Sequence, residues 1–173
     1  GEQKLFSITG NMKKNNEFPV VGDLVYLNES EEIITSIEPR KTKLSRKVAG
    51  TEIIEQILAS NIDYVFIVSS LNHDFNIARL ERYLTFVYES GANPVFVLTK
   101  ADIGEDIEEK ISELENISFG VPIYKVSVTE PESLEPIKKY FEKENLVTLV
   151  GSSGVGKSTL INSLLGHEVL ETQ

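Results

Sequence analysis

Residues 148–160 read TLVGSSGVGKSTL, and this stretch decides which fold the chain can adopt. An apolar run is followed by a glycine-rich turn and by the start of a helix. Gly151 to Ser158 match the pattern G-x-x-x-x-G-K-[ST], in which successive backbone N–H groups curl around a phosphate. The positive end of the following helix adds to this attraction. The motif requires a strand before it and a helix after it, so we interpret the stretch as a phosphate-binding loop rather than a glycine-rich surface turn.

Two side chains of this loop carry the chemistry of the motif. The Lys157 ammonium is expected to reach the β- and γ-phosphates of a nucleotide and to act as the catalytic cation. The Ser158 hydroxyl is expected to bind Mg²⁺. The residues expected to surround the phosphates are Gly151, Ser152, Ser153, Gly154, Val155, Gly156, Lys157, Ser158 and Thr159.

From residue 65 to residue 165, the chain alternates between apolar runs and amphipathic stretches. The apolar runs predict strands at 65–70, 95–99, 123–127 and 146–150. The amphipathic stretches predict helices at 78–90, 104–117, 132–143 and 157–165, with Leu134, Ile137 and Phe141 inward in the third. This alternation predicts an α/β domain with a mainly parallel sheet and helices on both faces. The carboxyl ends of its strands share one edge, where such sheets bind their ligands.

A second motif, Thr99-Lys100-Ala101-Asp102, follows the strand expected at 95–99. Taken alone, T-K-x-D also fits a plain strand-to-helix turn in which Asp102 caps the helix. At the ligand edge of the sheet, however, it resembles the guanine-reading [NT]-K-x-D motif of GTPases. The Asp102 carboxylate is expected to accept hydrogen bonds from guanine N1–H and N2–H₂, with the Lys100 stem over the base. Adenine has neither donor, so it would leave the carboxylate unpaired.

The order of the candidate loops along the chain is unusual. Ser127-Val128 lies where GTPases place a backbone N–H against guanine O6, and this weak signal counts only beside the other two. The base loops therefore precede the phosphate loop, whereas an ordinary GTPase has the reverse order. A circular permutation explains this order because it leaves the site intact in space.

The N-terminal part has a different character. Residues 1–45 are expected to form a small OB-like, RNA-binding β domain, with strands at 4–8, 21–27 and 32–38. Three or four strands are recognisable, so the barrel is expected to be incomplete unless a strand has been missed. Residues 46–61 are expected to form a basic linker and a short helix, and residues 62–173 the permuted GTPase domain.

Charge and composition narrow the possible partners. The net charge of −10 argues against a chain that coats nucleic acid with its whole surface. Five cations nevertheless cluster beside the OB-like part, and we expect them to contact RNA rather than to form a solvated linker. They are Arg40, Lys41, Lys43, Arg46 and Lys47. Cysteine is absent, which fits the cytoplasm, and no run of 18 apolar residues suggests a membrane span. His73 and His167 are expected to be structural or surface residues rather than a metal pair.

These features together resemble the RsgA (YjeQ) family of circularly permuted GTPases that depend on the small ribosomal subunit. The segments that carry the resemblance are FPVVGDLV (18–25), LSRKVAG (44–50), SLNHDFNIARLERYL (70–84), VLTKAD (97–102) and LVGSSGVGKSTLINSLLG (149–166). The resemblance implies an OB-type RNA-binding domain, a permuted GTPase domain and a C-terminal zinc domain. It also implies binding of GTP or GDP with Mg²⁺, hydrolysis stimulated by the 30S subunit, and a role late in assembly of that subunit.

The chain departs from the family pattern in three respects. No Asp is followed by Gly three residues later, as the D-x-x-G motif requires, and no Cys/His zinc ligands are present. No side chain is a convincing water-positioning group. We therefore expect a truncated chain that binds guanine nucleotides incompletely and hydrolyses GTP weakly. Two alternatives stay open: an ATP-dependent P-loop enzyme, and a non-catalytic RNA-binding module. The sequence does not indicate an oligomeric state.

Overall fold

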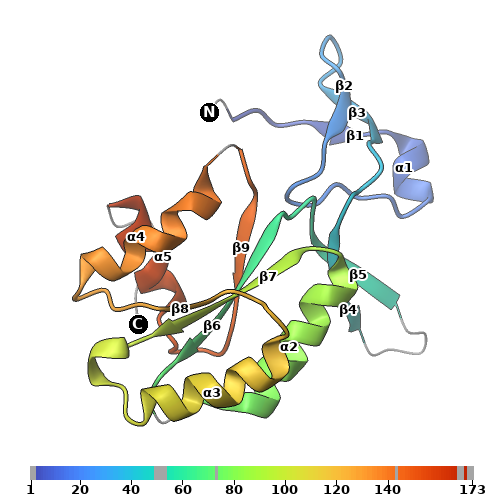
Figure 1. Cartoon of the computed structure of the whole chain (residues 1–173). Coiled ribbons are helices and arrows are strands. Elements are labelled where there is room, and N and C mark those ends of the chain that lie inside the picture. Colours follow the sequence, from blue (N-terminus) through green and yellow to red (C-terminus); the bar gives the residue numbers. More distant parts are fainter. Residues whose placement is uncertain (1–2, 49–53, 73, 143, 167–169, 171–173) are drawn as a thin grey trace. The chain divides into compact units, whose positions relative to one another are not determined.

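The computed structural model describes residues 3–48, 54–72, 74–142, 144–166 and 170. It divides into two compact units, an N-terminal unit of residues 1–62 and a C-terminal unit of residues 63–173 (Figure 1). Both histidines, His73 and His167, lie outside the described residues. None of the helices described is long and apolar enough to cross a membrane.

Residues 3–48 and 54–62 of the N-terminal unit form two small sheets and one short helix, α1 (Gly10–Lys14). One sheet has the order β1-β3-β2, with β1 parallel to β3 and β2 antiparallel to it; the other is the antiparallel hairpin β4-β5. The strands are β1 (Ser7–Ile8), β2 (Val25–Asn28), β3 (Ile33–Ile37), β4 (Lys43–Val48) and β5 (Ile54–Ser60). These small sheets agree with the expected OB-like character. Residues 1–45 hold β1, β2, β3 and the start of β4, in line with the three or four strands expected there, and β5 follows in the segment expected to be linker and helix.

The prediction of a short helix within residues 46–61 is wrong. Residues 54–60 form strand β5, which pairs with β4 in the register Arg46↔Gln56 and Lys43↔Ser60. The apolar positions of this segment fit a helical spacing, but tertiary pairing with β4 overrides so short a pattern. Cross-strand polar contacts support the hairpin, because Lys43 Nζ lies 3.0 Å from Glu55 Oε2 and Arg46 Nε lies 2.9 Å from Gln56 Oε1. The segment thus belongs to the N-terminal unit, which extends through Ile62.

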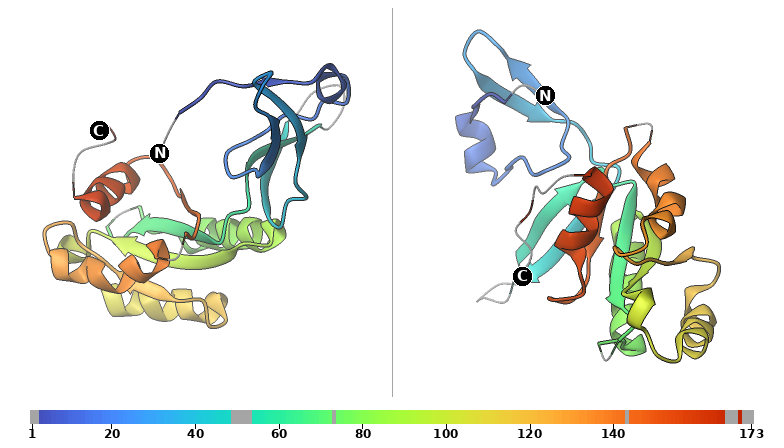
Figure 2. Two further views of the ribbon diagram at one scale, coloured as in Figure 1. Left: turned by 90° about the horizontal axis from the view of Figure 1, so that it is seen from above. Right: turned by 90° about the vertical axis from the view of Figure 1, so that its left-hand side faces the viewer.

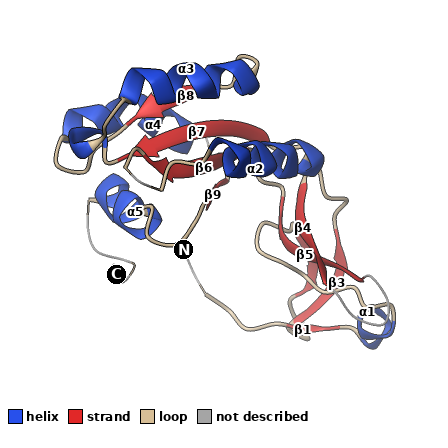
Figure 3. Ribbon diagram, turned by 90° about the horizontal axis from the view of Figure 1, so that it is seen from below, coloured by secondary structure: helices blue, strands red, loops and turns tan. Residues whose placement is uncertain are grey.

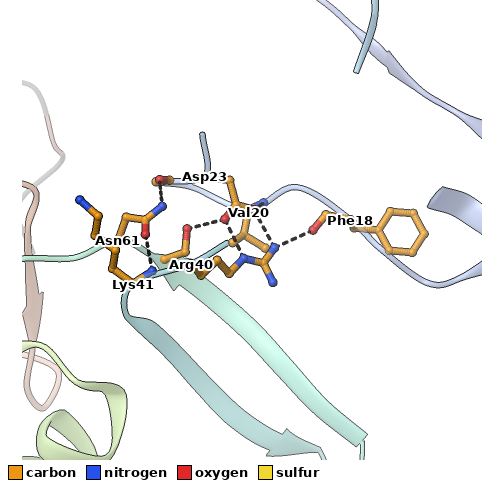
Figure 4. Close-up of polar contacts among 8 residues, drawn as sticks. Phe18, Val20, Asp23, Arg40, Lys41 and Asn61 are labelled. Atoms are coloured by element: carbon orange, nitrogen blue, oxygen red, sulfur yellow. Dashed lines mark hydrogen bonds and ion pairs between the residues drawn. The ribbon is translucent and has the colours of Figure 1, made fainter. Parts of the chain in front are cut away.

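A buried carboxylate ties the loop before β2 to the hairpin (Figure 4). The Asp23 side chain is only 1% exposed and accepts two 2.7 Å hydrogen bonds from the Arg40 guanidinium. It also accepts one at 2.5 Å from the Ser60 hydroxyl and one at 2.8 Å from Val20 N–H. Burial alone would raise the pKa of Asp23, but these donors and the Arg40 charge outweigh it, so the pKa lies below its ordinary value.

The glycine before Asp23 allows this close approach. Gly22 has φ +94°, and a Cβ on it would lie 1.9 Å from the Ser60 carbonyl oxygen. Its own carbonyl accepts a 2.9 Å hydrogen bond from Asn61 Nδ2. The V-G-D segment is therefore a structural joint of the N-terminal unit, in which only glycine fits the crowded position.

The C-terminal unit is a four-stranded parallel sheet with the order β8-β7-β6-β9 (Figure 3). Its strands are β6 (Tyr64–Ser70), β7 (Asn93–Thr99), β8 (Ile123–Lys125) and β9 (Val147–Val150). Successive residues of β6, from Val65 to Val68, are all at most 1% exposed, so helices cover both faces of the sheet. The expected parallel α/β domain is confirmed.

Helices occupy both sides of this sheet (Figure 2). Helix α2 (Ile77–Ser90) packs on β6 and β7 and contacts α3 (Ile107–Ser118). Ile137 of α4 (Glu135–Lys138) and Leu160 of α5 (Lys157–Leu165) share one core cluster on the other side. Gly91 ends α2 at φ +82°, which agrees with the predicted end of this helix at residue 90.

The helix expected at 132–143 is shorter and tighter than predicted. It consists of two 3₁₀ turns, η2 (Pro131–Leu134) and η3 (Lys139–Phe141), on either side of α4. A 3₁₀ turn has three residues instead of 3.6, so the inward phase shifts by one position. Tyr140 is consequently buried, whereas Phe141, expected inward, is 45% exposed. Helix α3 likewise begins later than expected, after the 3₁₀ turn η1 (Ala101–Ile103).

Removing the charge of Asp23 should destabilise the N-terminal unit. The substitution Asp23→Asn leaves the Arg40 guanidinium without its carboxylate, which typically costs about 2–4 kcal/mol for a pair of this burial. Hydrogen–deuterium exchange of residues 21–38 measures the loss, and Glu29→Gln, at an exposed position of the same unit, is the matched control. A change no larger than that of the control would contradict the role of Asp23.

The stability of this unit should also depend on pH through Asp23. Because its pKa is lower in the folded state, its contribution is present above the unfolded pKa, near 4, and is lost as the pH falls through the folded pKa. Denaturation curves between about pH 2 and 6 should show this slope in the native chain, and the Asp23→Asn variant should show a smaller one.

Candidate functional site

The order in which strands are added to the sheet reverses at β6. The chain runs from β6 outward to β7 and β8, and then returns to place β9 on the other side of β6. The loops that leave the carboxyl ends of β7 and β9 therefore flank the end of β6, and such a switch point is where open α/β sheets bind ligands. The two motifs expected to meet there, at residues 99–102 and 151–158, are these loops.

The loop after β9 has the backbone of an anion cradle. Gly151 passes so close to β6 that a Cβ would lie 2.3 Å from the Val68 carbonyl oxygen. Gly154 and Gly156 have φ of +79° and +94°, which glycine adopts without strain. The first hydrogen bond of α5 runs from Leu160 N–H to Gly156 C=O (2.8 Å), so the amides of the preceding helical turn remain available to an anion.

The Lys157 side chain folds back over this loop. Its ammonium donates hydrogen bonds to the carbonyl oxygens of Gly151 at 2.9 Å and Ser152 at 2.6 Å. Burial lowers the pKa of Lys157, because desolvation disfavours its charged form. A cation beside the N-terminal turn of a helix, where the first amides have no helical partner, is the arrangement expected for a polyphosphate ligand.

Thr99 and Lys100 join the strand β7 to the phosphate loop. The buried Thr99 hydroxyl lies 2.6 Å from the Val155 carbonyl oxygen and donates a hydrogen bond to it. Lys100 Nζ lies 3.3 Å from the Gly154 carbonyl oxygen, and Lys100 itself has φ +59°. The two residues thus hold the loop after β9 against the end of β7, although Thr99 itself is buried behind that loop.

Asp102 is held by the third loop. The Ser127 hydroxyl donates a 2.7 Å hydrogen bond to Asp102 Oδ1 and lies 2.7 Å from the Thr129 hydroxyl. The hydrogen bond from Ser127 is the main reason that the pKa of Asp102 lies below its ordinary value, so the carboxylate is charged at neutral pH. Within the described chain, the N–H of Val128 donates no hydrogen bond and the residue is 42% exposed.

The three motifs predicted from the sequence therefore come together through hydrogen bonds. Their remaining members differ in exposure: Ser153 is exposed, while Ser158 and Thr159 are half-buried in the first turn of α5. The Ser158 hydroxyl has no hydrogen-bond partner among the residues that the structure describes, which suits an oxygen expected to bind Mg²⁺. No group of three or more acidic, His or Cys side chains in the described ranges is arranged to hold a metal ion.

The five basic residues of the N-terminal unit are not equivalent. Arg40 is committed to Asp23, and Lys43 forms an ion pair with Glu55. Arg46 contacts the neutral Gln56, and Lys41 is exposed. The side chain of Lys47 lies outside the described part. RNA contact by these residues stays a prediction, and the available positive charge is smaller than the sequence suggests.

Sequence reasoning missed Thr129, whose hydroxyl lies 2.7 Å from that of Ser127, and it also missed Ser133. The Ser133 hydroxyl accepts a 2.9 Å hydrogen bond from the backbone N–H of Ser127. The spacing of six residues between the two serines, across Pro131, has no recognisable motif. Only the fold of the 3₁₀ turn η2 brings them together.

Comparisons with known proteins give one consistent result. The model of the RsgA GTPase family matches residues 37–173. "Small ribosomal subunit biogenesis GTPase RsgA 2" of Listeria monocytogenes is 44% identical over 158 residues, which are 91% of this chain and 45% of that protein. "Small ribosomal subunit biogenesis GTPase RsgA" of Methanosarcina acetivorans is 42% identical over 169 residues, 95% of this chain and 46% of the relative.

Two solved structures are similar as well. The crystal structure of YjeQ from Thermotoga maritima has a TM-score of 0.77 and 27% identity, covering 100% of this chain and 60% of that one. YloQ, described as a circularly permuted GTPase, has a TM-score of 0.64 and 25% identity, with coverage of 94% and 56%. The chain spans about half the length of the curated relatives that it matches.

Losing the hydroxyl of Thr99 should loosen the phosphate loop. The substitution Thr99→Val keeps the buried volume but leaves the Val155 carbonyl without its donor, at a cost of about 1–3 kcal/mol. Deuterium uptake by residues 151–158 should rise, and Thr99→Ser, which keeps the hydroxyl, should resemble the native chain. Equal uptake in all three proteins would contradict this joint.

Proposed function

The chain belongs to the RsgA GTPase family, and from this we propose that it forms the guanine-nucleotide site of a GTPase that acts in late maturation of the bacterial small (30S) ribosomal subunit. One observation carries the proposal. Three loops far apart in the sequence are joined by the hydrogen bonds Thr99–Val155, Lys100–Gly154 and Asp102–Ser127. A phosphate cradle and a candidate base reader therefore lie at one edge of one sheet.

The phosphate loop would bind the phosphates of GTP or GDP. The amides between Gly151 and Thr159 would donate to phosphate oxygens, and the Lys157 ammonium would exchange its carbonyl partners for the β- and γ-phosphates. Carbonyl oxygens are neutral acceptors, so a phosphate dianion would attract this cation more strongly. The Ser158 hydroxyl would be a ligand of Mg²⁺, which, when bound, neutralises charge on the phosphates.

Asp102 would select guanine. Its charged carboxylate accepts one hydrogen bond from Ser127 and has acceptor capacity left for the N1–H and N2–H₂ of guanine. Adenine would leave this capacity unused, which favours a GTPase over the ATP-dependent alternative. Lys100 would cover the base, and the free N–H of Val128 would meet guanine O6.

The reaction would be phosphoryl transfer to water. Lys157 and the loop amides would stabilise the negative charge that develops on the transferred group, because they are already aligned before the reaction. The residue that orients the attacking water is not assigned, and in this proposal it is contributed by the small subunit or by residues outside the described ones. We expect hydrolysis to be weak for these residues alone.

The names of the relatives support a partner and a location. The proteins from Listeria monocytogenes and Methanosarcina acetivorans are both named small ribosomal subunit biogenesis GTPases. We infer that the small ribosomal subunit is the partner here and that the protein acts in the cytoplasm.

Contact with ribosomal RNA would come from the N-terminal unit. Lys41 and Arg46 are the described cations of the basic stretch that lack a carboxylate partner, so their charge is available to phosphates. Arg40 and Lys43 would contribute less because Asp23 and Glu55 already neutralise them. The joined loops of the C-terminal unit, rather than this basic stretch, favour a factor that hydrolyses GTP over a purely RNA-binding module.

Two measurements test the function as a whole. Calorimetry should show that the chain binds GDP more tightly than ADP. A version spanning the full length of the relatives should hydrolyse GTP, and isolated small subunits should accelerate it. Equal affinity for the two nucleotides would reject the guanine site, and turnover unaffected by small subunits would reject the proposed partner.

Replacing Asp102 should change which base the chain binds most tightly. In Asp102→Asn the amide offers a donor where guanine also offers donors, so GDP affinity should fall about 100-fold. Xanthosine diphosphate, which presents an acceptor at that position, should gain affinity in the same variant. Asp106→Asn is the control, because Asp106 is exposed at the start of α3 and makes no capping hydrogen bond. An unchanged preference for GDP would reject Asp102 as the reader.

Removing the available basic charge should weaken subunit binding. The double variant Lys41→Gln, Arg46→Gln should lower the slope of log affinity against log salt concentration by about 1–2 units in binding to purified small subunits. A second double variant, Lys13→Gln with Lys14→Gln in α1, removes the same charge from exposed positions of the same unit. If both variants change the slope equally, the basic stretch has no special role.

A further inference from the structure

The hydroxyl of Ser133 is built into the backbone of the loop that follows β8. Its oxygen accepts a hydrogen bond from Ser127 N–H at 2.9 Å and lies 3.0 Å from the Ser127 carbonyl oxygen. It also lies 2.7 Å from the carbonyl oxygen of Glu130. A hydroxyl has one proton and can accept from more than one donor. The Ser133 side chain can therefore accept from Ser127 N–H while it donates to one of these carbonyl oxygens, and so it connects both ends of the loop.

Ser127 needs this partner because it is buried. The residue is 2% exposed, so its backbone N–H would have no access to water without the Ser133 oxygen. Three hydrogen bonds tie the neighbouring backbone: from Val126 N–H to Leu98 C=O at 2.8 Å, from Glu130 N–H to Ser127 C=O at 3.2 Å and from Ala101 N–H to Val126 C=O at 3.3 Å. None of them uses the N–H of Ser127, which the Ser133 oxygen satisfies.

The position of Ser127 sets the direction of two groups at the base end of the site. One is its own hydroxyl, whose single proton goes to Asp102 Oδ1 and whose oxygen accepts a hydrogen bond from Thr129 N–H at 3.2 Å. The other is the N–H of Val128, the next residue, which has no acceptor among the residues described. A shift of Ser127 would therefore move both the Asp102 carboxylate and the N–H of Val128.

We propose that Ser133 is a positioning residue for base recognition: it holds Ser127 so that Asp102 and the Val128 N–H are presented to guanine in fixed geometry. This inference rests on the proposed guanine site. Ser133 does not touch the nucleotide, and its effect passes through the backbone of Ser127. Specificity here would depend on donors and acceptors that are oriented before binding, which avoids an ordering cost when the base arrives.

The variant Ser133→Ala tests this role. The affinity for GDP should fall about 10-fold, as expected when one hydrogen bond of a buried network is removed, while the affinity for ADP should stay the same. The ratio of the two affinities should therefore fall about 10-fold. Ser133→Thr, which keeps the hydroxyl, should restore the ratio toward that of the native chain.

A matched control separates positioning from general stability. The Ser90 hydroxyl also bridges backbone groups, donating to Val87 C=O at 2.6 Å and accepting from Ala92 N–H at 3.2 Å. It lies at the end of α2, just before β7 begins, so it is at the opposite edge of the sheet. Ser90→Ala should lower the melting temperature in a similar way and leave the GDP-to-ADP affinity ratio unchanged.

The outcomes are distinct. A native chain that binds GDP and ADP equally rejects the proposed guanine site itself. A native chain that prefers GDP, with the same preference in Ser133→Ala, rejects only the positioning role, as does an equal loss of preference in Ser90→Ala. If Ser133→Ala does not fold, Ser133→Cys fills nearly the same space with a weak acceptor and should lower the ratio in the same direction. An unchanged ratio in that variant also rejects the role.

Discussion

The candidate nucleotide site depends on one buried hydrogen bond, from the hydroxyl of Thr99 to the carbonyl oxygen of Val155 at 2.6 Å. It joins the end of a strand to a glycine-rich loop that follows another strand, 56 residues later in the chain. Val155 anchors this glycine-rich loop in the core, but its other residues are small, so a neighbouring element must help to define its shape. Thr99 does so from the back of the loop, which leaves the amides at the front available to an anion.

The same principle extends from the phosphate loop to the base loops. Lys100 contacts Gly154, Asp102 accepts from Ser127, and Ser133 holds Ser127 in turn. Each contact connects a different element at the carboxyl edge of the sheet. The order of these elements along the chain is irrelevant to the contacts, because parallel strands present their ends at one edge whichever strand comes first. A circularly permuted chain can therefore build the same site.

The N-terminal unit has a comparable buried contact, and the sequence alone does not reveal it. Asp23 looked unremarkable within VVGDLV, yet it is the buried acceptor for Arg40, Ser60 and Val20. Arg40 in turn looked like a free cation in a basic run, and only its carboxylate partner reveals a structural role. A charge run in a sequence gives the number of charges. It does not say which of them are already neutralised inside the fold.

Much of the C-terminal unit could be predicted because its signals are local. Three of these signals depend only on neighbours in the chain. They are the apolar runs that became β6, β7 and β9, the end of α2 at Gly91, and the pattern from Gly151 to Ser158. Each follows from periodicity or from the backbone freedom of glycine.

Tertiary structure decided the rest. The hairpin β4-β5 formed where a helix was expected because its partner strand lies some ten residues away. Because 3₁₀ turns changed the phase, Tyr140 became buried and Phe141 is half-exposed, although its ring still packs against Phe66. The roles of Thr99 behind the loop and of Ser133 beneath Ser127 were likewise decided by the fold. Such roles depend on which buried N–H or C=O lies within about 3 Å of a hydroxyl, and that distance exists only once the chain has folded.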